Sequence, residues 1–230
     1  MNRYKYLLID ADGTFLDFEK TEHKALNKLM DRANWQDRDY FVRTYANSNR
    51  KAWNLYEDGQ IPSDQINNQR FTGLYSGLQK VGEPEMNAQE MGEFYLSQLC
   101  KGDFLIEGTL DFFEYLKKDY ILILATNGLA DVQYARIKRA GVEKYFDTVA
   151  ISQELGAYKP MAEYYEKAMA PYDYKKEEVL MIGDSLKTDM AGAEAFGIDS
   201  CWFNPGETLN DGKVSPTYEI ARLDEIQSLL

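Results

Sequence analysis

Cysteine and histidine are scarce in this sequence of 230 residues, which has two cysteines and one histidine. Cys100 and Cys201 form no CxxC pair and could be bridged only if the fold brought them together. We therefore expect two free thiols in a reducing cytoplasm. His23 lies outside every motif described below, which disfavours histidine-based catalysis.

Long apolar runs and basic charge are also lacking. No segment approaches the roughly 18 uncharged apolar residues of a membrane span. The N-terminal apolar stretch stops at Asp10 with no small-residue cleavage site after it, so we expect no signal peptide. Lys and Arg total 26 against 38 Asp and Glu, a net charge of −12, which argues against nucleic-acid polymers as partners. A small phosphorylated ligand remains possible, because a metal ion and one lysine reverse the sign of charge locally.

The chain does contain short apolar runs, each ending in polar residues, and 44% of its residues are hydrophobic. Continuous runs of this length are typical of strands buried on both faces of a parallel sheet. The expected strands are Tyr4–Ile9, Tyr120–Ala125, Thr148–Ile151, Val179–Ile182 and Cys201–Phe203. Helical patterns alternate with them at Leu129–Ala140, Met161–Ala170 and Lys187–Phe196. This order predicts an α/β fold with a doubly wound, mostly parallel sheet.

One segment, residues 17–99, breaks the alternation of strand and helix. It has helix-like stretches at Lys20–Ala33, Tyr40–Tyr56, Asp64–Leu78 and Ala88–Leu99 but no comparable buried strand. Glycines and prolines punctuate these stretches. We therefore expect an all-helical domain at 17–99, inserted into a core domain formed by 1–16 and 100–230.

Polar residues stand where three of the expected strands end, namely Asp10, Thr126 and Asp184. Lys159 stands where a later helix is expected to begin. Ligands of open α/β sheets bind beyond the carboxyl ends of the strands. We therefore expect these four side chains to share one crevice, although the chain separates them widely.

Closely spaced carboxylates point to a metal at this place. Asp10 and Asp12 lie two residues apart and repel each other unless a cation or a shared proton relieves them. With Asp184 and Asp189 they form a set of hard oxygen donors without nearby His or Cys, which favours Mg²⁺. Because Mg²⁺ accepts a phosphate oxygen as a further ligand, a phosphorylated substrate follows.

Two mechanisms are open on this chemistry. The metal could activate a water molecule, or a carboxylate could attack phosphorus and form an aspartyl-phosphate. The second mechanism needs an acid and base beside the nucleophile, a role for which Asp12 is suitably placed. Lys159 would offset the charge of the phosphoryl group, and Thr126 and the backbone amide of Asn127 could donate hydrogen bonds to its oxygens.

Four motifs in this order and spacing resemble those of the haloacid dehalogenase-like (HAD) superfamily: DADGT, ATNG, KP and GDSLKTD. The resemblance covers the core and implies a Rossmann-like fold, with the helical insertion as a cap domain. It implies Asp10 as the nucleophile that accepts the phosphoryl group and Asp12 as the general acid and base. It also implies phosphate-binding roles for Thr126 and Lys159.

The same resemblance implies a set of magnesium ligands. These are the Asp10 side chain, the Asp12 backbone carbonyl and Asp184, with Asp189 behind them. Dehalogenases of the superfamily lack the second aspartate, because a halide needs no proton to leave. The presence of Asp12 therefore favours phosphoryl transfer.

The helical insertion resembles the cap of bacterial pyrimidine 5′-nucleotidases that clear noncanonical nucleotides. The likeness rests on the NRKAW stretch at 49–53, on Tyr56, Gly59 and Ile61, and on Arg70-Phe71; SCWFN at 200–204 adds to it. It implies a nucleoside 5′-monophosphate as substrate, with Asn49, Trp53, Tyr56 and Arg70 as candidate contacts. Phe15 departs from the Leu or Val usual after DGT, and we expect it to alter packing only.

Two alternatives stay open. The first is a sugar-phosphate phosphatase or phosphoglucomutase on the same core, and the basic pair Arg50 and Lys51 would suit a mutase that holds a bisphosphate. The second is a catalytically silent binding module, although such proteins usually lose one of the two aspartates retained here. In every case we expect a small phosphorylated partner, no nucleic-acid polymer, no membrane, and a monomer or homodimer.

Overall fold

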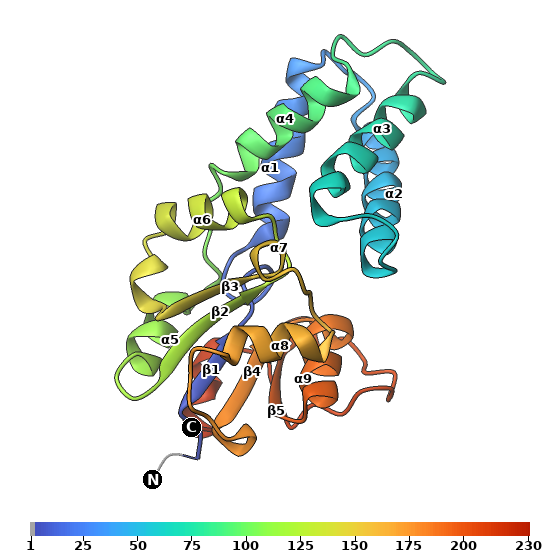
Figure 1. Cartoon of the computed structure of the whole chain (residues 1–230). Helices are drawn as coiled ribbons and strands as arrows, with labels where there is room; N and C mark the ends of the chain where they lie inside the picture. The colour runs from blue at the N-terminus through green and yellow to red at the C-terminus, as the bar shows by residue number, and fades with distance from the viewer. Residues whose placement is uncertain (1–2) are drawn as a thin grey trace. The chain divides into compact units, whose positions relative to one another are not determined.

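The computed structural model describes residues 3–230 and divides the chain into two compact units (Figure 1). The first unit, here the core, contains the residues up to Phe18 and Asp103–Leu230. The second, here the helical unit, is Glu19–Gly102. Each unit is described by itself below.

The core is built on a six-stranded sheet in the order β3-β2-β1-β4-β5-β6, and every neighbouring pair is parallel. The predicted α/β class with a doubly wound parallel sheet is confirmed. The strands are β1 (Tyr6–Ile9), β2 (Ile121–Thr126), β3 (Thr148–Ile151), β4 (Val179–Gly183), β5 (Asp199–Phe203) and β6 (Tyr218–Ile220). The sequence prediction missed β6, because its three residues include an exposed glutamate and form no apolar run.

Alternate residues of β1 to β5 contribute to two hydrophobic layers, one on each face of the sheet. Leu7 and Ile9 of β1 belong to the layer that contains residues of α5 (Thr109–Leu116) and α6 (Ala130–Arg139). Tyr6 and Leu8 belong to the opposite layer, with α8 (Ala162–Met169) and α9 (Ala191–Phe196). Helices therefore cover both faces, as the continuous apolar strands require.

Shorter elements complete the core. They are η2 (Glu143–Tyr145), α7 (Ser152–Leu155), η3 (Lys176–Glu178), η4 (Leu186–Met190) and η5 (Leu223–Ser228). The single helix expected over 187–196 is two elements, a π-helical turn η4 followed by α9. The helix ends where expected, at Gly197, whose φ of +80° is a conformation that glycine adopts readily.

The helical unit contains most of α1 (Phe18–Arg32), then α2 (Arg38–Glu57), η1 (Ser63–Gln65), α3 (Ile66–Leu78) and α4 (Ala88–Leu99). Side chains cap two of the helices: Asp37 accepts from the Tyr40 amide, and Asn87 forms a capping box with Glu90. The rings of Tyr45, Phe71 and Tyr95 pack against one another, with centroids 5.2–6.1 Å apart. The unit thus has its own aromatic core.

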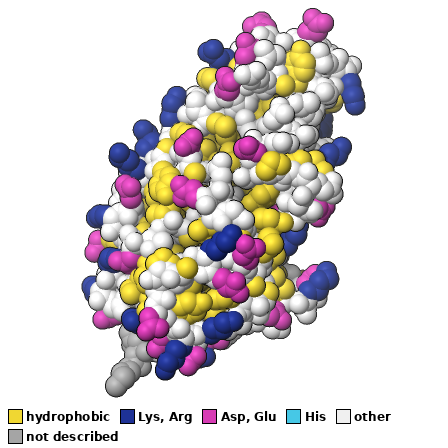
Figure 2. Space-filling model, viewed as in Figure 1, with side chains coloured by type: hydrophobic (Ala, Val, Ile, Leu, Met, Phe, Trp, Pro, Cys, Tyr) yellow, Lys and Arg dark blue, Asp and Glu magenta, His cyan; other side chains and the backbone are white. Residues whose placement is uncertain are grey.

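The surface carries mixed charge. Figure 2 shows acidic and basic side chains interspersed on the visible face, with no continuous basic stripe among the described side chains there. None of the described helices combines the length and the apolar character needed to cross a membrane.

The register of the sheet brings three strand ends together. Ile9 pairs with Leu124 of β2 on one side and with Ile182 of β4 on the other. The next residue, Asp10, donates its amide to the Ile182 carbonyl at 2.9 Å. The residues that follow β1, β2 and β4 consequently lie at one edge of the sheet, which is where the candidate site is found.

Candidate active site

Lys159 is the buried cation of the site. Its Nζ donates to Asp10 Oδ1 at 2.5 Å, to Asp189 Oδ1 at 2.6 Å and to the Ala125 carbonyl at 2.7 Å. All three N–H donors of the ammonium are therefore engaged. Burial lowers the pKa of Lys159, but the two carboxylates outweigh it and hold the pKa well above its usual value. The lysine is charged, and it ties the end of β1 to η4.

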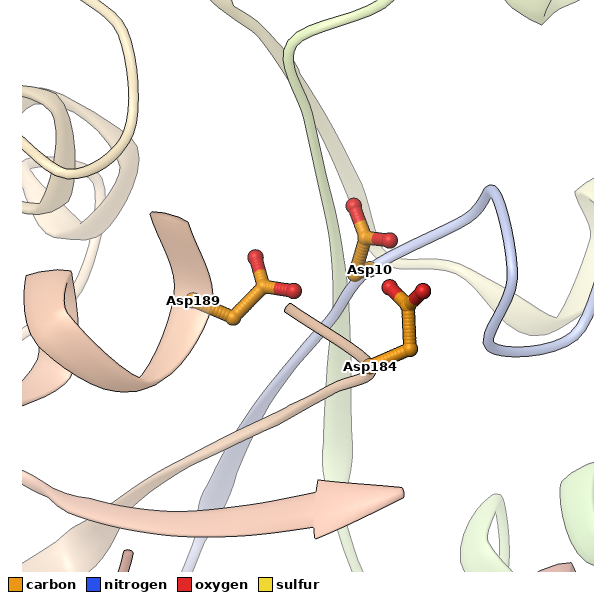
Figure 3. Close-up of side chains that lie close together, drawn as sticks. All are labelled: Asp10, Asp184 and Asp189. Atoms are coloured by element: carbon orange, nitrogen blue, oxygen red, sulfur yellow. The ribbon is translucent and has the colours of Figure 1, made fainter. Parts of the chain in front are cut away.

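Three carboxylates gather around this cation. Oxygens of Asp10, Asp184 and Asp189 lie within 4.8 Å of one another. Figure 3 shows them coming from the end of β1, the end of β4 and η4. Burial, and then repulsion from Asp189, raises the pKa of Asp184 to about 7. Burial also raises the pKa of Asp10 well above its usual range, with Lys159 opposing and the neighbouring carboxylates adding to the shift.

These carboxylates fit a divalent cation. The donors are hard oxygens, and a cation would offset the burial and the mutual repulsion that raise the pKa values of Asp10 and Asp184. Both Asp189 oxygens are already engaged, Oδ1 by Lys159 and Oδ2 by the Ser185 amide at 3.1 Å. Asp10 and Asp184 are therefore the side chains best able to bind Mg²⁺. A Cβ at Gly13 would lie 2.3 Å from Asp184 Oδ2, so the loop after β1 packs closely against this carboxylate.

Asn127 and Thr126, at the end of β2, organise the loop that faces the cluster. The Thr126 hydroxyl accepts the Gly128 amide at 3.0 Å. The Asn127 side chain accepts the Lys159 amide and donates to the Lys159 carbonyl, both at 2.9 Å. The sequence predicts only the backbone amide of Asn127 as a phosphate contact and gives no signal for this side-chain clamp. Lys159 itself lies in a turn before α8 rather than at a helix start, and its bond to Pro160 is cis.

Asp12 is bound by two residues of α6, Gln133 and Arg136. Its Oδ2 accepts from Gln133 Nε2 at 2.7 Å, and its Oδ1 forms an ion pair with Arg136 Nη1. The Asp12 side chain is 29% exposed, whereas that of Arg136 is 1% exposed. In the sequence, Gln133 and Arg136 are polar residues beside the apolar stripe of a predicted helix. That pattern does not distinguish them from surface residues.

The four candidate substrate contacts fall in two places within the helical unit. Trp53 is half-buried, and its ring lies 5.9 Å from that of buried Tyr56 at 72°. Asn49, one turn before Trp53 on α2, has a buried Oδ1 without a hydrogen-bond partner among the described residues. Arg70 of α3 is buried and lies over the rings of Tyr45 and Tyr95 instead.

Known proteins with similar sequences and structures indicate the family of this chain. Residues 4–197 match the family of haloacid dehalogenase-like hydrolases. The chain is 33% identical to the HAD-hydrolase YfnB of Bacillus subtilis, over all of this chain and 97% of YfnB. A crystal structure of YfnB bound to magnesium superposes with a TM-score of 0.89 and covers 100% of this chain and 99% of that one.

Two pyrimidine 5′-nucleotidases are also similar to this chain. PynA of Streptococcus pneumoniae is 35% identical over 99% of this chain and 95% of its own length. YjjG of Escherichia coli is 25% identical over 99% of this chain and 98% of its own length. Both similarities extend through the helical unit as well as the core.

Proposed function

Because the chain belongs to the haloacid dehalogenase-like hydrolases, we propose that it is a Mg²⁺-dependent phosphomonoesterase that works through an aspartyl-phosphate. The observation that carries the proposal is the buried cluster in which Lys159 joins Asp10 to Asp189 beside Asp184. Such a cluster pairs a carboxylate nucleophile with a fixed positive charge. It also leaves two oxygen donors suited to a cation.

The reaction has two steps on this site. Asp10 attacks phosphorus, the P–O bond to the leaving group breaks, and Asp12 gives its proton to the departing ester oxygen. Water then attacks phosphorus and passes a proton to Asp12, and the aspartyl-phosphate bond breaks to release phosphate and restore Asp10. Throughout, Lys159, the Thr126 hydroxyl and the Asn127 amide offset charge on the phosphoryl oxygens.

Asp10, Asp184 and the backbone carbonyl of Asp12 would hold the metal, with Asp189 fixed behind them. A bound Mg²⁺ screens the negative phosphate from the negative nucleophile. Burial, and then repulsion from Asp189, raises the pKa of Asp184, and a bound cation would offset both effects. The structure of YfnB bound to magnesium supports this choice of ion.

For the substrate we propose a nucleoside 5′-monophosphate. Support comes from the similarity to PynA and YjjG and from half-buried Trp53, an aromatic ring of the kind on which a base stacks. We assign substrate selection to the helical unit, with Asn49 and Arg70 as further candidate contacts. We also propose a reducing compartment such as the cytoplasm, which the buried free thiol of Cys201 supports.

The test is a screen of the purified protein with Mg²⁺ against nucleoside monophosphates, sugar phosphates and p-nitrophenyl phosphate, with phosphate release as the readout. We expect the highest kcat/KM with a pyrimidine nucleoside 5′-monophosphate. Asp10→Asn should abolish turnover without lowering Tm, whereas Asp211→Asn, in an exposed loop, should change nothing. A preference for sugar phosphates would overturn the nucleotidase assignment, and activity in Asp10→Asn would overturn the mechanism.

A further inference from the structure

Arg136 is a buried charge in the middle of α6. It is among the largest fully buried side chains of the described core. Among the described residues its one ion pair is with Asp12, and its guanidinium also lies 5.4 Å from the centre of the Phe18 ring. Burying a cation is costly unless it is paired, so Arg136 depends on Asp12 for its place in the core.

Gln133 makes the matching contact from one turn earlier on the same helix. Its Nε2 donates to Asp12 Oδ2 at 2.7 Å, while Arg136 takes Oδ1. The two residues, three positions apart, share one face of α6. Together they engage both oxygens of the carboxylate, which fixes its orientation as well as its position.

This arrangement leaves other polar atoms unsatisfied. Among the described residues, Nε and Nη2 of Arg136 and Oε1 of Gln133 are buried without a hydrogen-bond partner. Apolar side chains would fill the same volume without that cost. Stability alone therefore does not explain a glutamine and an arginine here, and a role toward Asp12 does.

Gly128 makes room for the contact. A Cβ at this position would lie 2.1 Å from Gln133 Nε2 and 2.8 Å from its Cδ and Cγ. Any side chain there would push Gln133 off its present path. The glycine that follows Thr126 and Asn127 thus connects the loop after β2 to the orientation of Asp12.

We propose that Arg136 and Gln133 are positioning residues, which hold Asp12 through both oxygens in the orientation from which it exchanges protons with the ester oxygen and with water. The inference rests on the proposed function, in which Asp12 is the general acid and base.

The experiment compares kcat/KM for two esters that need the acid to different degrees. Uridine 5′-monophosphate has an alkoxide leaving group that requires a proton, whereas p-nitrophenolate leaves readily without one. For Gln133→Leu and Arg136→Met, we expect kcat/KM for the nucleotide to fall about tenfold to a hundredfold, and that for p-nitrophenyl phosphate to fall several-fold less. Arg136→Lys, which keeps a donor and the charge, should recover part of the loss.

A matched control lies on the same helix. Arg139 is exposed and sits 3.8 Å from Asp103, so Arg139→Met removes the same charge from α6 without touching Asp12. It should leave kcat/KM for both esters unchanged. Gln133→Leu alters no charge, and it decides the question if Arg136→Met does not fold.

The outcomes separate the two proposals. Equal losses for both esters in Gln133→Leu, or no loss in either, would overturn the positioning role while leaving the phosphatase in place. Wild-type protein that hydrolyses neither ester would instead overturn the proposed function, and the positioning role with it. A selective loss for the nucleotide, with partial recovery in Arg136→Lys, supports the inference.

Discussion

The Asn127 side chain holds the backbone of Lys159 through two hydrogen bonds. Its Oδ1 accepts from the Lys159 amide and its Nδ2 donates to the Lys159 carbonyl, each at 2.9 Å. The Lys159 side chain then reaches Asp10 at 2.5 Å. The end of β2 therefore sets the position of the cation that faces the proposed nucleophile. Asn127 therefore has two proposed roles: its backbone amide contacts phosphate, and its side chain positions Lys159.

We expect Asn127→Ala to lower kcat by about tenfold to a hundredfold, because a small displacement of Lys159 weakens charge stabilisation at the phosphoryl group. Asn127→Asp keeps the acceptor for the Lys159 amide and loses the donor, so its loss should be smaller. The measurement is steady-state phosphate release.

Asn210 provides the control for this prediction. Its side chain also accepts from a backbone amide, that of Gly212, and donates to a backbone carbonyl, that of Val214, at 2.9 Å each, but in an exposed loop. Asn210→Ala should leave kcat unchanged. Equal rates in Asn127→Ala and wild type would mean that Lys159 keeps its place without the clamp.

Removal of metal should stop phosphate release. Oxygens of Asp10 and Asp184 lie within 4.8 Å of each other, and without a cation their repulsion opposes approach of a phosphate. Excess EDTA should abolish turnover and added Mg²⁺ should restore it, while Asp184→Asn should raise the Mg²⁺ concentration needed for half-maximal rate. A rate indifferent to EDTA would exclude the metal.

The strand ends were predictable from the sequence alone. Asp10 and Lys159 are 149 positions apart, yet the apolar run before Asp10 and the order of elements place both at the carboxyl edge of a parallel sheet. Continuous apolar runs give a strong signal, because a strand buried on both faces has no polar alternation.

Contacts made by side chains across elements were not predictable. Gln133 and Arg136 are polar residues on an amphipathic helix. The sequence pattern of such a helix does not distinguish them from a solvated residue such as Arg139. Only the position of Asp12 in space distinguishes them. The same limit applies to the Asn127 clamp, which depends on where the turn at Lys159 passes.

Asp147 gives a prediction of pH dependence. Its Oδ2 accepts Lys117 Nζ at 2.8 Å and the Leu122 amide at 2.9 Å. Partial burial raises its pKa, but these hydrogen bonds outweigh the burial and hold the pKa below its usual value. A carboxylate with a lowered folded-state pKa stabilises the protein above its unfolded pKa of about 4 and loses that contribution as pH falls.

Asp147→Asn should therefore lower Tm at neutral pH, and the difference from wild type should shrink as pH falls below about 4. Thermal unfolding of both proteins from pH 3 to pH 7 measures this. Asp64→Asn, at an exposed position, should show no pH-dependent difference. A Tm difference that is constant across the range would show that the carboxylate charge is not the cause.

Trp53 tests the choice of substrate. If its ring, beside that of Tyr56, stacks on the base, Trp53→Ala should raise KM for uridine 5′-monophosphate about tenfold, the effect of losing one base–aromatic stack. KM for p-nitrophenyl phosphate, which has no nucleobase, should change much less. Trp35, whose Nε1 bonds the Asp37 carbonyl within the same unit, provides the control, and Trp35→Ala should leave both KM values unchanged. Equal increases for the two esters in Trp53→Ala would instead assign the ring to packing, since loss of structure affects every substrate alike.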